Sequence, residues 1–231
     1  MTPTVDTFHA LARSSPWRWM TLHFEHRSKF PGPCEAWVRR PGELLVRTPD
    51  GRAERASGLP YTSSFGVAAV SDPGYTPPPL PRPVLPHEAT PTYRDDGLVA
   101  VRPAAHFEVN YDDPMYGNYS WVAMLDPVEL ADGVAPTDVR EDVVAGRPVW
   151  RADVRALPDY DPRCSCCALI WSEVADTYEY GDRPGWTPVK EKYPDHYDVA
   201  LDVETGVVVR CLPVGGDPDA AWFENDILEV R

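Results

Sequence analysis

The sequence predicts a mainly β (α+β) protein: a curved antiparallel sheet or half-barrel with an N-terminal helix and a short middle helix. Three observations lead to this prediction. Apolar and polar residues alternate with a period of two along several segments, as in strands with one covered face. Turn dipeptides such as Pro-Gly and Asp-Gly separate these segments. The 231 residues include 27 prolines, which favour short elements joined by rigid turns.

The N-terminal helix is expected over residues 4–13. Thr4 or Asp6 can cap its first turn, and Ser14-Ser15-Pro16 ends it. Its apolar stripe has helical spacing and consists of Val5, Phe8 and Leu11 or Ala12.

Strands follow this helix. Residues 17–27 alternate, with Met20, Leu22 and Phe24 pointing to one side. Pro41-Gly42 marks the turn of a hairpin, and Asp50-Gly51 marks the next turn. The strands expected here are 35–40, 43–48 and 52–56.

The middle of the chain is irregular. Residues 71–91 contain eight prolines and cannot form a helix or a central strand. We interpret this stretch as a proline-rich excursion within a single domain of residues 1–231, because neither flank is a complete β fold. A short strand is expected at 98–102. Asp126-Pro127, after the apolar run 121–125, has the pattern of an N-cap followed by proline, so a short helix is expected to begin there.

The C-terminal part is expected to return to hairpins. Their turns are Ala145-Gly146-Arg147 and Glu204-Thr205-Gly206. The expected strands are 139–144, 148–156, 164–172, 197–203, 207–212 and 223–230.

The formal net charge of −14 bears on the partners. It argues against a nucleic-acid surface, which needs clustered Lys and Arg. The charge is compatible with a basic protein partner or a cationic ligand, and solubility alone would also explain it. An acidic intracellular interaction or immunity-type protein is therefore one alternative function. No apolar run is long enough for membrane insertion, and no leader pattern is present, so a cytoplasmic location is expected.

A curved sheet with one apolar face can hold an apolar ligand on its concave side. The first hypothesis is therefore a non-catalytic binding protein for a hydrophobic or lipid-like small molecule, closed by the run 121–125. Its candidate ligand-binding residues are Met20, Leu22, Phe24, Val38, Leu44, Val46, Trp121 and Met124, with Ala36 on the same face.

Three of the five cysteines lie within four residues, at Cys164, Cys166 and Cys167. Thiolates bind soft metals, so Cys164 and Cys166 are candidate metal ligands. In a strand these two would share one face and Cys167 would point away. Buried apolar side chains and a disulfide are the other two interpretations, and all three stay open. A thiol- or metal-dependent enzyme is accordingly a second alternative function. Nucleophile, dinucleotide and phosphate-binding motifs are missing from the sequence, so no catalytic residue and no cofactor is predicted.

Two segments carry a family resemblance. Residues 8–24 run from a helix into a Trp-rich strand, and residues 197–210 contain Leu201-Asp202-x-x-Thr205-Gly206-x-x-x-Arg210. Both resemble the bacterial lipoprotein-carrier proteins and their actinobacterial lipid-binding relatives. The resemblance implies a half-barrel of antiparallel strands with helices in its mouth, and a bound acyl chain.

Overall fold

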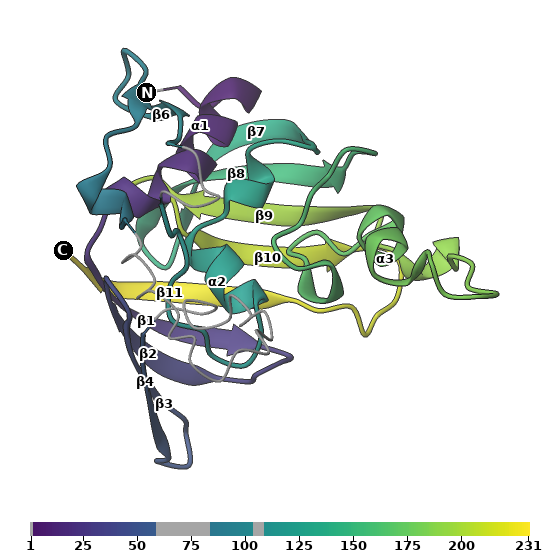
Figure 1. The fold of residues 1–231 in the computed structure, drawn as a ribbon, viewed down its shortest axis with the longest axis horizontal. Helices are drawn as coiled ribbons and strands as arrows, with labels where there is room; N and C mark the ends of the chain where they lie inside the picture. The colour runs from purple at the N-terminus through teal and green to yellow at the C-terminus, as the bar shows by residue number, and fades with distance from the viewer. Residues whose placement is uncertain (1, 59–83, 104–108) are drawn as a thin grey trace, which may run out of the picture.

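The computed structural model describes residues 2–58, 84–103 and 109–231, and its main feature is a nine-stranded antiparallel sheet (Figure 1). The strand order is β4-β3-β2-β1-β11-β10-β9-β8-β7. The strands are β1 Thr21–Ser28, β2 Cys34–Arg39, β3 Glu43–Arg47, β4 Ala53–Ser57, β7 Val134–Val144, β8 Arg147–Ala156, β9 His196–Asp202, β10 Val208–Val214 and β11 Phe223–Val230. A separate pair is formed by β5 Thr92–Tyr93 and β6 Val99–Val101.

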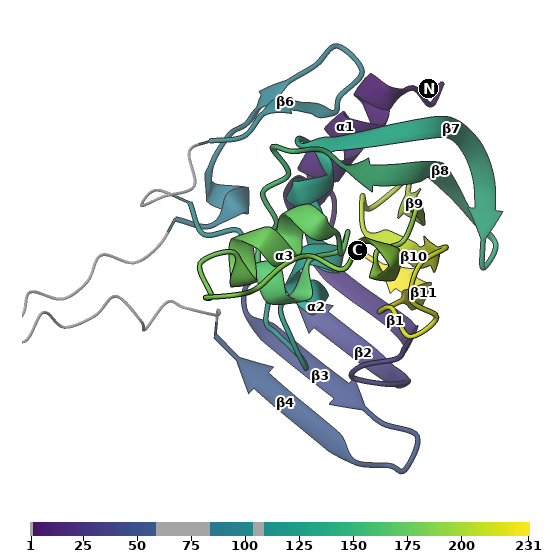
Figure 2. The same cartoon turned by 90° about the vertical axis from the view of Figure 1, so that its right-hand side faces the viewer.

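Helices occupy one side of this sheet. They are α1 Val5–Ser14, α2 Ser120–Leu125 and α3 Glu173–Tyr180. Short 3₁₀ turns are η1 Ser15–Trp17, η2 Pro86–Glu88, η3 Val128–Leu130, η4 Ser165–Cys167 and η5 Lys190–Lys192. Figure 2 shows the sheet curving around the helices, with β4 and β7 at its two open edges. The predicted curved antiparallel sheet with an N-terminal helix and a short middle helix is confirmed.

The sheet consists of two meanders joined by its first and last strands. β1 to β4 form one meander, and β7 to β11 form the other. β1 pairs with β11, so that Phe24 lies opposite Ile227, while Leu22 lies opposite Val38 of β2. The segment between the meanders in sequence supplies α2, which packs on β10 from the concave side.

The core fills the space between the sheet and the helices. Phe24 contacts Trp121 of α2 at a ring-centroid distance of 5.5 Å. The apolar faces of the first three strands are 5% exposed or less, as are Trp121 and Met124. On α1, Thr4 caps the first turn by accepting a hydrogen bond from the Thr7 N–H, and Phe8, Leu11 and Ala12 are fully buried.

Buried ion pairs hold α2 and the segments that flank it against the rest of the protein. Arg40, which follows β2, makes two hydrogen bonds to Asp113 at 2.8 and 2.7 Å and stacks on Trp19. Asp126, after α2, accepts from both Arg102 and Arg163. Because bidentate guanidinium–carboxylate pairs fix orientation, α2 and its flanks are held in place by directional contacts as well as by packing.

The opposite face of the sheet carries a ladder of charges across six strands. From β7 to β1 its members are Asp142, Arg151, Asp198, Arg210, Glu224 and Arg27, with successive N–O distances of 2.7, 2.6, 2.7, 2.6 and 3.7 Å. Acidic and basic groups alternate along it. The net negative charge of the chain is therefore not displayed as a continuous acidic surface on this face.

Some sequence expectations are corrected at the N-terminus. Val5 is 45% exposed and does not share the buried stripe of α1, because it lies in the first turn, beyond the sheet. Trp17 belongs to η1, and the strand begins at Thr21. Met20 therefore precedes the strand and is 38% exposed.

Other corrections concern the second half. The α-helix of the middle segment is the apolar run itself, and only the short 3₁₀ turn η3 begins after Asp126-Pro127. The Asp126 side chain does not cap η3, because its carboxylate is engaged by Arg102 and Arg163. Residues 164–172 form η4 and an extended loop instead of a strand. The last hairpin is confirmed, although a bulge in β10 alters the pairing near Val208. Of the proline-rich excursion 71–91, residues 71–83 lie outside the described residues.

Among the described residues, the helices are all too short or too polar to cross a membrane.

Candidate functional site

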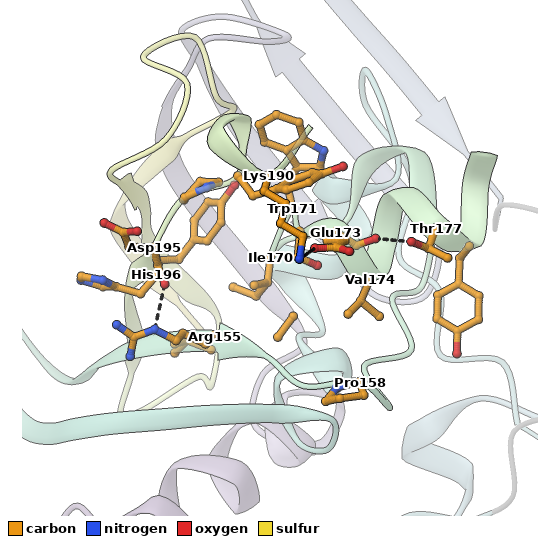
Figure 3. Close-up of a pocket in the computed structure, with 17 residues that line it drawn as sticks. Arg155, Pro158, Ile170, Trp171, Glu173, Val174, Thr177, Lys190, Asp195 and His196 are labelled. Carbon is orange, nitrogen blue, oxygen red and sulfur yellow. Dashed lines mark hydrogen bonds and ion pairs between the residues drawn. The ribbon is translucent and has the colours of Figure 1, made fainter. Parts of the chain in front are cut away.

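An open surface pocket of about 740 Å³ lies between the ends of β8 and β9 and the helix α3 (Figure 3). We call it the α3 cavity. Its apolar and aromatic lining consists chiefly of Val154, Ile170, Trp171, Val174, Tyr193 and Tyr197. Val154, Ile170 and Tyr197 are at most 2% exposed and form its floor, whereas the other three are half-buried and form its wall.

Asp176 of α3 holds the aromatic wall. One of its carboxylate oxygens accepts from the Trp171 indole N–H and the other from the Tyr193 hydroxyl, each at 2.9 Å. The two rings then meet edge to face at 5.2 Å. Ser172 caps α3 by accepting from the Ala175 N–H. The cavity wall is therefore preorganised by hydrogen bonds.

Polar groups surround the opening of the α3 cavity. Arg155 donates to the backbone carbonyl of Asp195 at 2.8 Å, and Lys190 lies 3.9 Å from Glu173 (Figure 3). The His196 side chain points away from the cavity to the other face of the sheet, where its Nε2 lies 3.7 Å from the Asp153 carboxylate. Burial raises the pKa of the Tyr197 phenol well above its ordinary value, so this group stays neutral at the cavity floor. Such a site offers an apolar floor with polar partners near its entrance.

The second candidate is the segment Cys164–Cys167, which we call the cysteine turn. Because η4 curls this segment, the three Sγ atoms lie within 4.8 Å of one another. Cys164 and Cys166 are 3.1 Å apart, and Cys166 and Cys167 are 4.0 Å apart. The expectation that Cys167 points away is wrong, because it assumed a strand. The Cys-x-x-Cys spacing of Cys164 and Cys167 is the signal that could have found the third thiol.

The remaining two cysteines are elsewhere. Cys34 and Cys211 are buried and free. Burial raises the pKa of the Cys34 thiol to about 12. These two thiols are therefore inert core side chains. The interpretation of Cys166 and Cys167 as buried core side chains is wrong, because Cys166 is exposed and Cys167 is only half-buried.

Most residues of the predicted concave-face site lie in the core. Leu22, Phe24, Val38, Leu44, Val46, Trp121 and Met124 are each 5% exposed or less. A ligand against Phe24 would have to displace Trp121 of α2. Leu22, Val38 and Leu44 also border a surface depression of about 660 Å³ at the ends of β1 to β4, next to Trp37 and Leu45. Met20 does not line this depression or the α3 cavity.

Comparison with known proteins gives no match: no protein-family model, no curated protein and no solved structure is similar to this chain at a significant level.

Proposed function

We propose that the chain is a non-catalytic binding protein that holds a hydrophobic or lipid-like small molecule in the α3 cavity. The observation that carries this proposal is the cavity itself, about 740 Å³ in volume, with a floor of Val154, Ile170 and Tyr197. Ligand pockets in proteins usually span about 300–1,000 Å³ and combine an apolar lining with a few polar groups.

The polar groups suggest how such a ligand would be oriented. Its apolar part would lie on the floor, and a hydroxyl or carboxyl head would lie at the opening, beside the exposed Lys190. The resemblance of residues 8–24 and 197–210 to lipoprotein carriers supports the same class of ligand.

The site proposed here differs from the one expected on the first strands. On the first strands, Phe24 packs against Trp121, whereas the α3 cavity is already open beside β8 and β9. Both sites lie on the helix-bearing side of the sheet, so a ligand in either of them would be held by the curved sheet.

Displacement of a fluorescent fatty acid tests the proposal. The wild-type chain should bind about one probe per molecule, and an unlabelled fatty acid should compete. Val174→Arg places a long charged side chain in the cavity wall, so binding should weaken at least tenfold, by about 1.4 kcal/mol or more. Val143→Arg is the matched control, because Val143 is 64% exposed on β7 and does not line the cavity.

Leu45→Arg separates the two sites. Leu45 lines the depression that Leu22, Val38 and Leu44 border, and it does not line the α3 cavity, so the charge would disturb only a ligand held on the first strands. Loss of binding in Leu45→Arg with normal binding in Val174→Arg would contradict the α3 cavity. Absence of probe binding by the wild-type chain would reject the binding function altogether.

A further inference from the structure

The cysteine turn presents three thiols at one point of the surface. Their Sγ atoms all lie within 4.8 Å of each other, and the separations include 3.1 and 4.0 Å. Around a metal with M–S bonds of about 2.3 Å, thiolate sulfurs stand about 3.8–4.0 Å apart. Small side-chain rotations of the three cysteines are thus enough to bring them to coordination distance.

One buried carboxylate accepts hydrogen bonds from the backbone on both sides of this turn. Glu129 of η3 accepts from the Arg163 N–H at 2.9 Å, just before the turn, and from the Leu169 N–H at 2.7 Å, just after it. The Tyr160 hydroxyl donates to the same carboxylate at 2.7 Å. The base of the turn is therefore fixed, which is how a protein preorganises ligands.

Further contacts hold the turn from its outer side. Ser165 donates to Glu179 of α3 at 2.7 Å, and the Arg163 side chain is paired with Asp112 and Asp126. The Cys167 N–H closes η4 by donating to the Cys164 carbonyl at 3.2 Å. Arg163, Ser165 and Leu169 around the thiols are thus held by hydrogen bonds, while Cys166 itself is exposed and accessible to an ion from solvent.

We propose that Cys164, Cys166 and Cys167 form a three-thiolate site for a soft d¹⁰ cation, with Cu(I) as the preferred ion. The donor set consists of sulfur alone, and thiolates select Cu(I) and Zn²⁺ over hard cations. Among the described residues, no histidine, carboxylate or fourth cysteine joins the cluster. Structural Zn²⁺ sites need four protein ligands, whereas three sulfurs complete a trigonal Cu(I) site.

Binding exchanges protons for the metal. Each thiol that coordinates releases its proton to solvent, and no electron is transferred because the ion enters as Cu(I). Burial raises the pKa of the Cys167 thiol above its ordinary value, so without an ion this group is protonated. This inference is independent of the α3 cavity, since none of the three cysteines lines that cavity.

The test is an anaerobic titration of the full chain, reduced with a phosphine, against a chromophoric Cu(I) chelator. The wild-type chain should remove one equivalent of Cu(I) and show a thiolate-to-metal charge-transfer band in the ultraviolet. Cys166→Ser should bind Cu(I) roughly a hundredfold more weakly, since one of three ligands is lost. Because Cys166 is exposed, this variant should fold normally, and circular dichroism checks that it does.

Cys34→Ala is the matched control, because Cys34 is a free thiol remote from the turn in sequence and lies in β2. It should keep one tight Cu(I) equivalent. Unchanged affinity in Cys166→Ser would overturn the proposal, and so would equal losses in Cys166→Ser and Cys34→Ala. A parallel titration with Zn²⁺ that binds more tightly than Cu(I) would reject the preferred ion. A disulfide among the three cysteines that survives the phosphine would reject the site.

Discussion

Asp126 has no exposed surface and lies between two guanidinium groups. Burial alone would raise its pKa, but the charges of Arg102 and Arg163 outweigh this effect and hold the pKa of Asp126 below its ordinary value. The carboxylate therefore stays ionised. Its role is to fix the chain after α2 to the segments that carry Arg102 and Arg163.

Replacing Asp126 by Ala should destabilise the protein by about 3–5 kcal/mol, because Arg102 loses its carboxylate partner and Arg163 loses one of its two. Urea unfolding followed by circular dichroism measures the loss. Asp142→Ala is the matched control: Asp142 pairs with Arg151 near the surface, with 36% of its side chain exposed, and such pairs contribute less than about 1 kcal/mol. Similar losses in the two variants would contradict the structural role of Asp126.

His26 makes the stability depend on pH. Burial lowers its pKa to about 4, and the hydrogen bond of 2.7 Å with Asn225 opposes this only in part. In the unfolded chain the pKa is about 6.5, so between these values the unfolded state binds the proton and the folded state does not. The stabilisation is fully present above about pH 6.5 and is lost as pH falls toward 4.

We expect the free energy of unfolding to drop by about 3 kcal/mol over this range on account of His26, at about 1.4 kcal/mol per pKa unit. Unfolding titrations of wild type and His26→Gln at several pH values isolate the effect, because the difference between them should shrink as pH falls. His87→Gln, on the exposed turn η2, serves as control and should follow the wild-type profile. A constant difference between wild type and His26→Gln would disprove the assignment.

At the scale of elements, the turn between β9 and β10 packs directly against α1. Gly206 has φ +75°, and a Cβ there would lie 2.9 Å from the Leu11 carbonyl oxygen. Gly206→Ala should therefore lose stability both from backbone strain and from this clash, about 2–4 kcal/mol in all. Thermal and urea unfolding measure it.

Gly146, in the turn between β7 and β8, allows the backbone strain to be measured without the steric clash. Its φ is +79°, but an added Cβ would meet no described atom within 4 Å. Gly146→Ala should cost only the backbone strain, about 1 kcal/mol. An equal loss in the two alanine variants would show that the contact of the hairpin with α1 contributes nothing.

The same elements explain what the sequence could predict. The β2–β3, β7–β8 and β9–β10 hairpins were predicted because their signals are local: alternation in the strands and glycine in the turns. Residues 164–172 are apolar enough for a strand, but the Leu169 and Ile170 N–H groups donate to Glu129 and to the Tyr160 hydroxyl instead of a neighbouring strand. Those partners come from distant parts of the chain, so no local pattern reveals them.

The candidate sites also combine features that have a local sequence signal with features that depend on contacts between distant residues. Cys164 and Cys166 were identified from composition, but the convergence of Cys167 depends on η4, which Glu129 anchors. The α3 cavity was missed because its wall depends on α3, an element that the apolar pattern did not indicate, and on the contacts of Asp176 with Trp171 and Tyr193. Trp121 packs against Phe24 of β1 and Met124 contacts Asn225 of β11, and both side chains belong to the core.

For the whole molecule, the junction of β1 with β11 is decisive. It connects the two meanders through one strand pair, in which Ile227 faces Phe24 and is only 6% exposed. The helices also contact both meanders, since α1 packs on β7 and β9 while Trp121 of α2 contacts Phe24 of β1. A chain so connected should unfold as one cooperative unit.

Ile227→Ala tests this cooperativity. Removing the buried side chain should cost about 2–5 kcal/mol, because apolar contact is lost and a cavity remains. If the meanders form one unit, amide hydrogen exchange should accelerate by the same free energy in β2 and in β9, although only β1 and β10 adjoin the substituted strand. Leu228→Ala, at a position 48% exposed on the same strand, should leave the exchange rates in β2 and in β9 nearly unchanged. Faster exchange confined to one meander, either β1–β4 or β7–β11, would mean that the two are separate folding units despite their shared sheet.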